Sequence, residues 1–228
     1  MTGNDDVWVV IPVYNEAPVL EGVLREVLAV FPNVVCIDDG SRDGSVDAVL
    51  RTRAHLVRHP VNLGQGAALQ TGLTYARSRP GAAYFVTFDA DGQHSLDDAV
   101  RMVELARSGT VDLVLGTRFA DDAGDVPWLK RLVLRAAVRL SPAGRRLRLT
   151  DAHNGLRVLT RPVAEDLHIT MNGMAHASEI VAYLARSRWR VAEVPVSIRY
   201  TAYSRAKGQS LLNGVNILFD LSVRQRGG

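Results

Sequence analysis

The chain has 228 residues, of which 47% are hydrophobic, and a formal net charge of +3. A chain of this length and composition can bury a full core within one domain, which excludes a disordered protein. It has no run of the roughly 18–20 apolar residues that a membrane-spanning helix requires. Residues 1–6 do not resemble a secretory signal, and the one cysteine, Cys36, lies in an apolar run. We therefore expect a cytoplasmic protein with a buried thiol.

Strands and helices alternate through the first half of the chain. Short apolar runs predict strands, and apolar positions at helical spacing predict helices. The predicted strands are residues 7–13, 34–37, 55–58, 84–88 and 112–116. The predicted helices are residues 17–30, 45–53 (with Ser45 as N-cap), 62–76 and 96–107. This alternation is typical of an α/β fold with a mostly parallel central sheet flanked by helices.

The pattern changes after residue 125. Helices are predicted at residues 128–140, 178–187 and 211–223, and an extended segment at 189–200. In the first of these helices Arg131, Arg135 and Arg139 recur every four residues and share a face. The chain shows no internal repeat or low-complexity linker, so we treat residues 1–228 as one domain with two halves, 1–125 and 126–228.

Charge is sorted along the chain. Residues 1–50 carry nine acidic and two basic side chains, whereas residues 126–228 carry six acidic and seventeen basic ones. This asymmetry predicts two surfaces with different tasks. Most of the bases are arginine, which suits bidentate contact with phosphate, although a GC-rich genome also enriches arginine. Few aromatic residues are interleaved with the arginines, which argues against a nucleic-acid binder.

Polar residues follow four of the predicted strands. They are Asn15-Glu16, Asp38-Asp39, Asp89 to Asp91, and Thr117-Arg118. Right-handed crossovers place the carboxyl ends of parallel strands at one edge of the sheet, where such sheets bind ligands. Turn-forming residues alone explain one polar strand end, but they poorly explain several carboxylates that converge.

The central motif is Asp89-Ala90-Asp91-Gly92-Gln93. Two carboxylates two residues apart at a strand end can bind one hard divalent cation, and Gln93 offers a third oxygen. One alternative is a simple Asp-Gly turn. Another is a phosphatase of the haloacid dehalogenase type, with Asp89 as nucleophile. The glutamine at position 93, where that motif has Thr or Ser, and the mid-chain position of the motif argue against it.

The order and spacing of several motifs carry a family resemblance. They are Pro12-Val13-Tyr14-Asn15-Glu16, Asp38-Asp39-Gly40-Ser41, Asn62-Leu63-Gly64-Gln65-Gly66, the motif at 89–94, Gly116-Thr117-Arg118, Asp151 with Asn154-Gly155-Leu156-Arg157, Glu193-Val194-Pro195-Val196, and the segment 200–210. Together they resemble the family 2 glycosyltransferases of GT-A fold. More narrowly, they resemble the dolichyl- and polyprenyl-phosphate sugar synthases.

The resemblance implies a donor site and a metal. A nucleotide sugar would be bound by Pro12, Tyr14, Asn15, Glu16, Asp38, Asp39, Gly64, Gly66, Asp89 and Ala90. Mg²⁺ or Mn²⁺ would be held by Asp89, Asp91 and Gln93. Many members of the family have Lys after the first glycine of the 62–66 motif, where this chain has Gln65. A phosphate contact from that position is therefore not expected.

The resemblance also implies an acceptor site. The implied catalytic residues are Asp91, Arg118, Arg131 and Asp151, and the acceptor phosphate would be held by Arg118, Arg131, Arg205 and Lys207. Asp151 would either form a salt bridge with Arg118 or Arg157, or assist the acceptor directly. His176 would be a late metal ligand, a cap or a packing residue.

These implications define the expected activity. A UDP- or GDP-linked sugar would be transferred, with inversion, to a polyprenyl phosphate by an enzyme peripheral at the inner face of the membrane. The membrane surface, a small membrane protein or a second copy of the chain are expected partners. Two alternatives are a transferase to a saccharide or other hydroxyl, with Asp151 as base, and a non-catalytic nucleotide-sugar-binding subunit.

Overall fold

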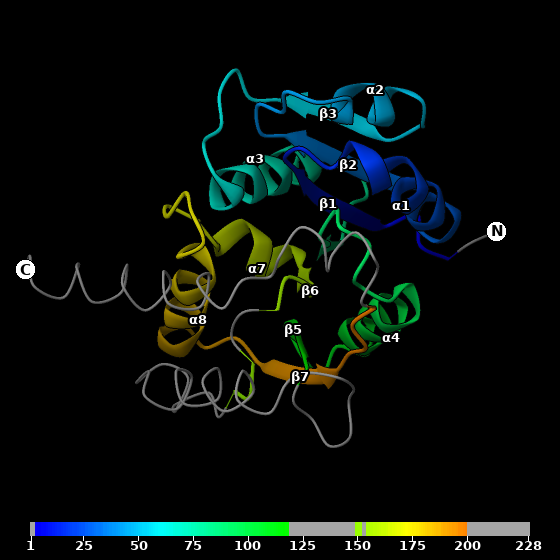
Figure 1. Ribbon diagram of the computed structural model, residues 1–228. Helices are drawn as coiled ribbons and strands as arrows, with labels where there is room; N and C mark the ends of the chain where they lie inside the picture. The colour runs from blue at the N-terminus through cyan, green and yellow to red at the C-terminus, as the bar shows by residue number, and fades with distance from the viewer. Residues whose placement is uncertain (1–2, 119–148, 152–153, 200–228) are drawn as a thin grey trace, which may run out of the picture.

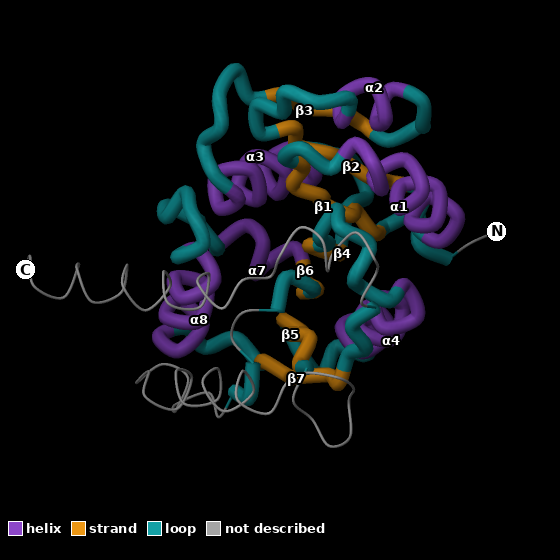
Figure 2. The backbone as a smooth tube through the Cα atoms, viewed as in Figure 1, coloured by secondary structure: helices purple, strands orange, loops and turns teal. Residues whose placement is uncertain are grey.

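One seven-stranded sheet organises the molecule. A computed structural model describes residues 3–118, 149–151 and 154–199. The strands are β1 (Val7–Val13), β2 (Asn33–Asp38), β3 (His55–Arg58), β4 (Tyr84–Thr87), β5 (Leu113–Thr117), β6 (Arg157–Thr160) and β7 (Val191–Pro195). Their order in the sheet is β3-β2-β1-β4-β6-β5-β7, and Figure 2 shows this stack from β3 at the top to β7 at the bottom.

The predicted mostly parallel α/β sheet is confirmed. Strand β6 pairs antiparallel with β4 and β5, whereas the other neighbouring pairs are parallel. The carboxyl ends of β1, β2, β4 and β5 therefore share one edge of the sheet, together with the amino end of β6.

Helices cover both faces of the sheet, as Figure 1 shows. They are α1 (Ala17–Val30), α2 (Ser45–Leu50), α3 (Gln65–Arg77), α4 (Leu96–Arg107), α7 (Arg161–Asp166) and α8 (His176–Arg186). Apolar residues of α1, α2 and α4 form one core cluster, and those of α3, α7 and α8 form the other. In β1, Val9 and Ile11 join the first cluster while Trp8 and Val10 join the second. Burial on both faces explains why this strand is a continuous apolar run.

The starts of three helices differ from the prediction, and α8 begins at His176, two residues before the predicted start at 178. Helix α2 begins at Ser45 with Gly44 as its N-cap, so the assignment of Ser45 as cap was wrong. The Ser45 hydroxyl instead accepts a hydrogen bond from the Glu16 backbone N–H at 2.8 Å. Helix α3 begins at Gln65 and not at residue 62, because Gly64 has φ +99°, outside the helical region.

Strand β6 and helix α7 were not predicted. They span only ten consecutive residues, 157–166, with no turn residues between strand and helix. The strand also opens with the buried Arg157, which interrupts the apolar pattern that normally marks a central strand. Tertiary packing, and not local pattern, therefore determines this part of the chain.

The two halves of the sequence interleave in the sheet. Strand β6, from the second half, lies between β4 and β5, both from the first half. The predicted helices 128–140 and 211–223 lie outside the described residues. In the part of the chain that the structure describes, no helix has the length and apolar character needed to cross a membrane.

Candidate active site

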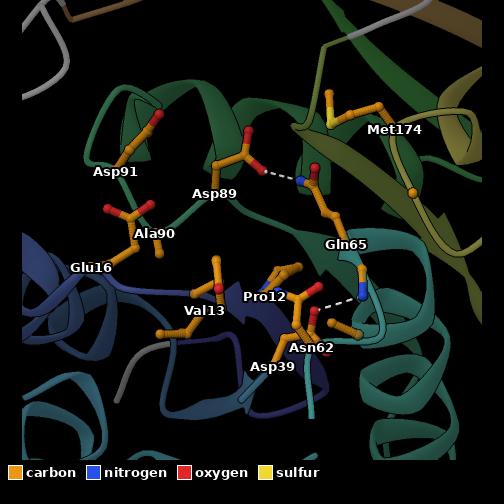
Figure 3. A pocket seen from close by; sticks show the side chains of 14 residues that line it. Pro12, Val13, Glu16, Asp39, Asn62, Gln65, Asp89, Ala90, Asp91 and Met174 are labelled. Atoms are coloured by element: carbon orange, nitrogen blue, oxygen red, sulfur yellow. Dashed lines mark hydrogen bonds between the residues drawn. The ribbon is translucent and has the colours of Figure 1, made fainter. Parts of the chain in front are cut away.

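A cleft of about 470 Å³ lies at the carboxyl edge of β1, β2 and β4. Among the predicted donor-site and metal residues, its lining includes Pro12, Tyr14, Glu16, Asp39, Gly64, Asp89, Ala90 and Asp91. The lining also includes Val13, Asn62 and Gln65, which belong to the motifs but were not predicted as site residues, and Ala68, Gly173 and Met174, which no motif contains. Figure 3 shows Glu16 and Asp91 on one side of the cleft and Gln65 and Met174 on the other.

Three predicted donor-site residues lie outside this lining. Asn15, at φ +55°, accepts a hydrogen bond from the Arg42 backbone N–H at 2.9 Å, which joins the end of β1 to the following loop. Asp38 is fully buried and accepts from the Ser41 backbone N–H at 3.2 Å. Gly66 packs against residues 171–172. Their contact with a nucleotide stays a prediction, and the contacts they make shape the loops of the cleft.

Asp39 fixes the loop that precedes α3. One of its oxygens, Oδ1, accepts from the Leu63 N–H at 2.9 Å and lies 2.7 Å from His59 Nδ1, while Oδ2 accepts from the Gly64 N–H at 2.7 Å. The side chain of His59 is held in turn by Thr71, with Nε2 to Oγ1 at 3.0 Å. This buried network sets the backbone of residues 63–64 against the cleft.

Asp89 is held on both carboxylate oxygens. Gln65 Nε2 donates to Oδ1 at 3.1 Å, the contact drawn in Figure 3, and His94 Nε2 lies 2.9 Å from Oδ2. Burial alone would raise the pKa of Asp89, but the hydrogen bond and charge of His94, with the charge of Arg157, lower it below its usual value. Asp89 is therefore an oriented, ionised carboxylate.

Asp91 has the opposite electrostatic environment. Burial raises its pKa, and the negative charge of Asp89 raises it further. Gln93 holds the carboxylate, since its backbone N–H donates to Oδ1 at 3.0 Å and its side-chain Nε2 donates to Oδ2 at 2.8 Å. The amide nitrogen of Gln93 thus faces Asp91, so Gln93 supports this carboxylate, and direct ligation by Gln93 stays a prediction.

The carboxylates fit a divalent cation. The negative charges of Asp89 and Asp91 repel each other, and a cation bound to both would relieve that repulsion. Within the described ranges, no three His, Cys, Asp or Glu side chains are grouped closely enough to hold a metal by themselves. Mg²⁺ commonly binds through one or two carboxylates and completes its shell with water and phosphate oxygens. Asp89 and Asp91 match that pattern.

One wall of the cleft comes from the second half of the chain. The Gly66 N–H donates to the Asn172 carbonyl at 2.7 Å, and a Cβ on Gly66 would lie 2.0 Å from the Met171 carbonyl oxygen. A Cβ on Gly64 would lie 2.3 Å from the Asn172 carbonyl oxygen. The two glycines therefore allow residues 171–173 to approach the start of α3, and Gly173 and Met174 then line the cleft.

A second polar cluster lies at the end of β5. Arg118 donates to Asp151 twice, from Nε to Oδ2 at 2.6 Å and from Nη2 to Oδ1 at 2.9 Å, and Asp151 is 2% exposed. The predicted salt bridge between these residues is confirmed. Because the guanidinium binds both oxygens, the geometry favours Asp151 as the residue that orients Arg118 over Asp151 as a base.

A buried arginine lies between the two clusters. Arg157 is 3% exposed, and its Nη1 has no hydrogen-bond partner within the described part of the chain. Burial lowers its pKa, while the charges of Asp89 and Asp151 oppose that shift. Burial and the charge of Arg157 lower the pKa of His176 to about 4, so His176 is neutral at pH 7. The motif 151–157 drew attention to Arg157, but only the fold places it between Asp89 and Asp151.

Three of the predicted acceptor residues, Arg131, Arg205 and Lys207, lie outside the described residues. The structure therefore brings together the donor-side carboxylates and places Arg118 with Asp151 at the same edge of the sheet. The donor role of these carboxylates and the acceptor role of Arg118 and Asp151 stay predictions.

Comparison with known proteins agrees with this arrangement. The family model "Glycosyl transferase family 2" matches residues 8–167. An undecaprenyl-phosphate mannosyltransferase of Micrococcus luteus is 31% identical, over 90% of this chain and 86% of that protein. The UDP-N-acetylglucosamine–dolichyl-phosphate N-acetylglucosaminyltransferase of Methanococcus voltae is 25% identical, over 97% and 96%.

A solved structure shares the fold. The glucosyl-3-phosphoglycerate synthase of Mycobacterium tuberculosis, in complex with Mn²⁺, UDP and glucosyl-3-phosphoglycerate, superposes with a TM-score of 0.65 at 18% identity, over 96% of this chain and 79% of that one. The GT-A fold expected from the sequence is thereby confirmed. With the family model covering most of the chain, the protein belongs to glycosyl transferase family 2 and is a glycosyltransferase.

Proposed function

We propose that this glycosyltransferase moves a hexose-type sugar from a UDP- or GDP-linked donor to a polyprenyl phosphate, with inversion and with Mg²⁺ or Mn²⁺. The observation that carries the proposal is the division of charge along one sheet edge. Carboxylates line the donor cleft, and an oriented arginine, Arg118, lies at the end of β5. Relatives named as dolichyl- or undecaprenyl-phosphate glycosyltransferases support this choice of acceptor.

The donor side would bind the nucleotide and its leaving group. Asp39 and Glu16 line the cleft where a base and ribose would lie, and Asp89 and Asp91 would hold the cation. When bound, the cation neutralises the negative charge that develops on the departing diphosphate. None of the described lining residues is basic, so within the described part of the chain the bound cation would be the main source of that neutralisation.

The acceptor side would bind a phosphate monoester. One acceptor oxygen attacks the anomeric carbon while the bond from that carbon to the donor diphosphate breaks, so the nucleoside diphosphate leaves with the bonding pair. A phosphate oxygen is already anionic near neutral pH, so this step needs no strong general base. It needs cations that hold the phosphate in line, and Arg118 is suited to that role.

Association with lipid belongs to the same proposal. A polyprenyl phosphate lies in a bilayer, and basic residues between Lys130 and Arg148 would attract anionic headgroups by about 1 kcal/mol per charge near the surface. We therefore place the enzyme at the inner face of the membrane, alone or with a small membrane-protein partner or second copy. Flotation with anionic vesicles, but not with neutral ones, is the expected result.

Product analysis tests the acceptor. A thermal-shift screen of UDP, GDP, CDP and dTDP, with and without Mn²⁺, first identifies the base. Sugar-labelled donors with that base are then incubated with undecaprenyl phosphate in detergent. The proposal expects label in an organic-extractable product that mild acid cleaves. Label only in water-soluble saccharide would favour the hydroxyl-acceptor alternative, and nucleotide binding without any transfer would favour a non-catalytic subunit.

A further inference from the structure

Two glutamates make the same set of contacts at two places in the fold. The carboxylate of Glu193, on β7, accepts from the backbone N–H of Thr150 at 2.9 Å and of Asp151 at 3.0 Å, and from the Thr150 hydroxyl at 3.1 Å. The carboxylate of Glu179, on α8, accepts from the backbone N–H of Thr170 at 3.0 Å and of Met171 at 2.9 Å, and from the Thr170 hydroxyl.

Each carboxylate captures a threonine and the residue after it. A backbone segment held by two N–H groups and a hydroxyl on one charged acceptor loses most of its freedom to rotate, and hydrogen bonds to a charged group are the stronger kind. The two glutamates therefore fix two short segments, 150–151 and 170–171. We call these contacts the Glu193 clamp and the Glu179 clamp.

The Glu193 clamp leads to Arg118. The clamped residue Asp151 accepts from the Arg118 backbone N–H at 3.2 Å and from its guanidinium through both oxygens. The hydroxyls of Thr117 and Thr150 are 2.6 Å apart and join the same segment to the end of β5. Burial and the negative charge of Asp151 raise the pKa of Glu193. A neutral side chain at position 193 would therefore also remove the repulsion between Glu193 and Asp151.

The Glu179 clamp leads to the donor cleft. Its clamped residues 170–171 continue directly into Asn172, whose carbonyl accepts from the Gly66 N–H, and then into Gly173 and Met174, which line the cleft. The two clamps therefore hold different sides of the site, and neither glutamate lines the cleft itself.

We propose that Glu193 is a positioning residue for the acceptor phosphate, acting through Asp151 on Arg118, and that Glu179 is the corresponding positioning residue for the nucleotide sugar. The assignment rests on the proposed function, since it takes Arg118 as an acceptor contact. Although the two glutamates make equivalent contacts, Glu193 is expected to affect the KM for the acceptor and Glu179 the binding of the nucleotide.

The test is a crossed comparison of Glu193→Gln and Glu179→Gln. Glutamine keeps the length of the side chain but presents an amide N–H₂ to donors that need an acceptor. For Glu193→Gln we expect the KM for undecaprenyl phosphate to rise at least about tenfold, because the substitution removes one or two hydrogen bonds to a charged acceptor. The dissociation constant of the nucleoside diphosphate with Mn²⁺, measured by calorimetry, stays within about twofold.

For Glu179→Gln we expect the reverse: weaker nucleotide binding by about tenfold, with the acceptor KM within about twofold. Glu165→Gln, at an exposed surface ion pair with Arg161, is the neutral control. Thermal unfolding shows how much stability each variant loses. Glu193→Asp restores the charge and is expected to recover part of the acceptor KM.

Equal effects of both variants on both substrates, or a fall in kcat alone, would show that the clamps only stabilise the fold, and would overturn the inference. If wild-type enzyme binds nucleotide but forms no product with undecaprenyl phosphate, the proposed function itself fails. In that case the acceptor role of Glu193 fails with it, whereas the role of Glu179 is still decided by calorimetry.

Discussion

The donor side of the sheet edge and the side at the end of β5, which we call the β5 side, differ in how their charged residues are paired. On the donor side, Asp89 and Asp91 face a cleft whose described lining contains no basic residue, and the charge of Asp89 raises the pKa of Asp91. On the other side, Arg118 is already paired with Asp151, which is held by backbone hydrogen bonds to Glu193. In the described residues, the carboxylates of the proposed donor side are thus ones that a bound cation would neutralise, whereas Arg118 and Asp151 on the β5 side are already paired with each other.

The largest effect is expected at the carboxylates that are proposed to hold the cation. Asp91→Asn should reduce transfer by at least about a thousandfold, because loss of a proposed metal ligand would remove charge stabilisation of several kcal/mol from the transition state. Nucleotide binding by calorimetry should also lose its response to Mn²⁺. Asp97→Asn, at an exposed position in the first turn of α4, is the matched control. Near wild-type turnover by Asp91→Asn would contradict the metal assignment.

The next effect, on stability, is expected at Gly66, because the wall formed by residues 171–173 packs closely against this glycine. Gly66→Ala should destabilise the protein by about 2–3 kcal/mol, because its Cβ would overlap the Met171 carbonyl oxygen and displace that wall. Gly22→Ala, in α1 with open space around the Cβ, should instead stabilise by about 0.5–1 kcal/mol through helix propensity. Denaturant unfolding of both variants, together with nucleotide binding by Gly66→Ala, checks the comparison. If the two variants are equally stable, close packing is not the reason for glycine at position 66.

The smallest effect is expected from the protonation of His176. It tests the region between the two sides, where the charge of Arg157 acts on His176. Its folded-state pKa of about 4 lies below the ordinary 6.5, so the unfolded chain binds the proton more readily. Stability should therefore fall as pH drops through this window, by roughly 1.5 kcal/mol between pH 6.5 and pH 5. His176→Asn, which can still donate to the Gly173 carbonyl, should remove this part of the pH dependence. His168→Asn, at an exposed position, should leave it in place; an unchanged slope in His176→Asn would contradict the assignment.

Much of the donor side could be predicted from sequence because it is local. The apolar runs of β1, β2 and β4 and the carboxylates that follow them need only the rule that parallel strands share an edge. The function of Gly64 and Gly66 could not be predicted, since the backbone they accommodate lies about a hundred residues away. The Glu193 clamp was missed for the same reason, because Glu193 reaches residues 42 and 43 positions away in sequence.

Strand β6 shows where a sequence pattern is insufficient. Its four residues begin with a buried arginine, and their strand conformation depends on β4 and β5 on either side. Neither partner is adjacent in sequence, and no alternation of apolar and polar residues marks the strand. The position of Arg157 between Asp89 and Asp151 is therefore a property of the assembled sheet.

The insertion of β6 between β4 and β5 has a consequence for how such a chain can change during evolution. A fragment of residues 1–125 would contain β4 and β5 without the strand that joins them, leaving β4 as an open edge. We expect that fragment to be insoluble, or to be unfolded by circular dichroism where it stays in solution. Acceptor preference in this architecture then cannot be exchanged as a separable module; it has to change by substitution within a framework that both parts of the chain build together.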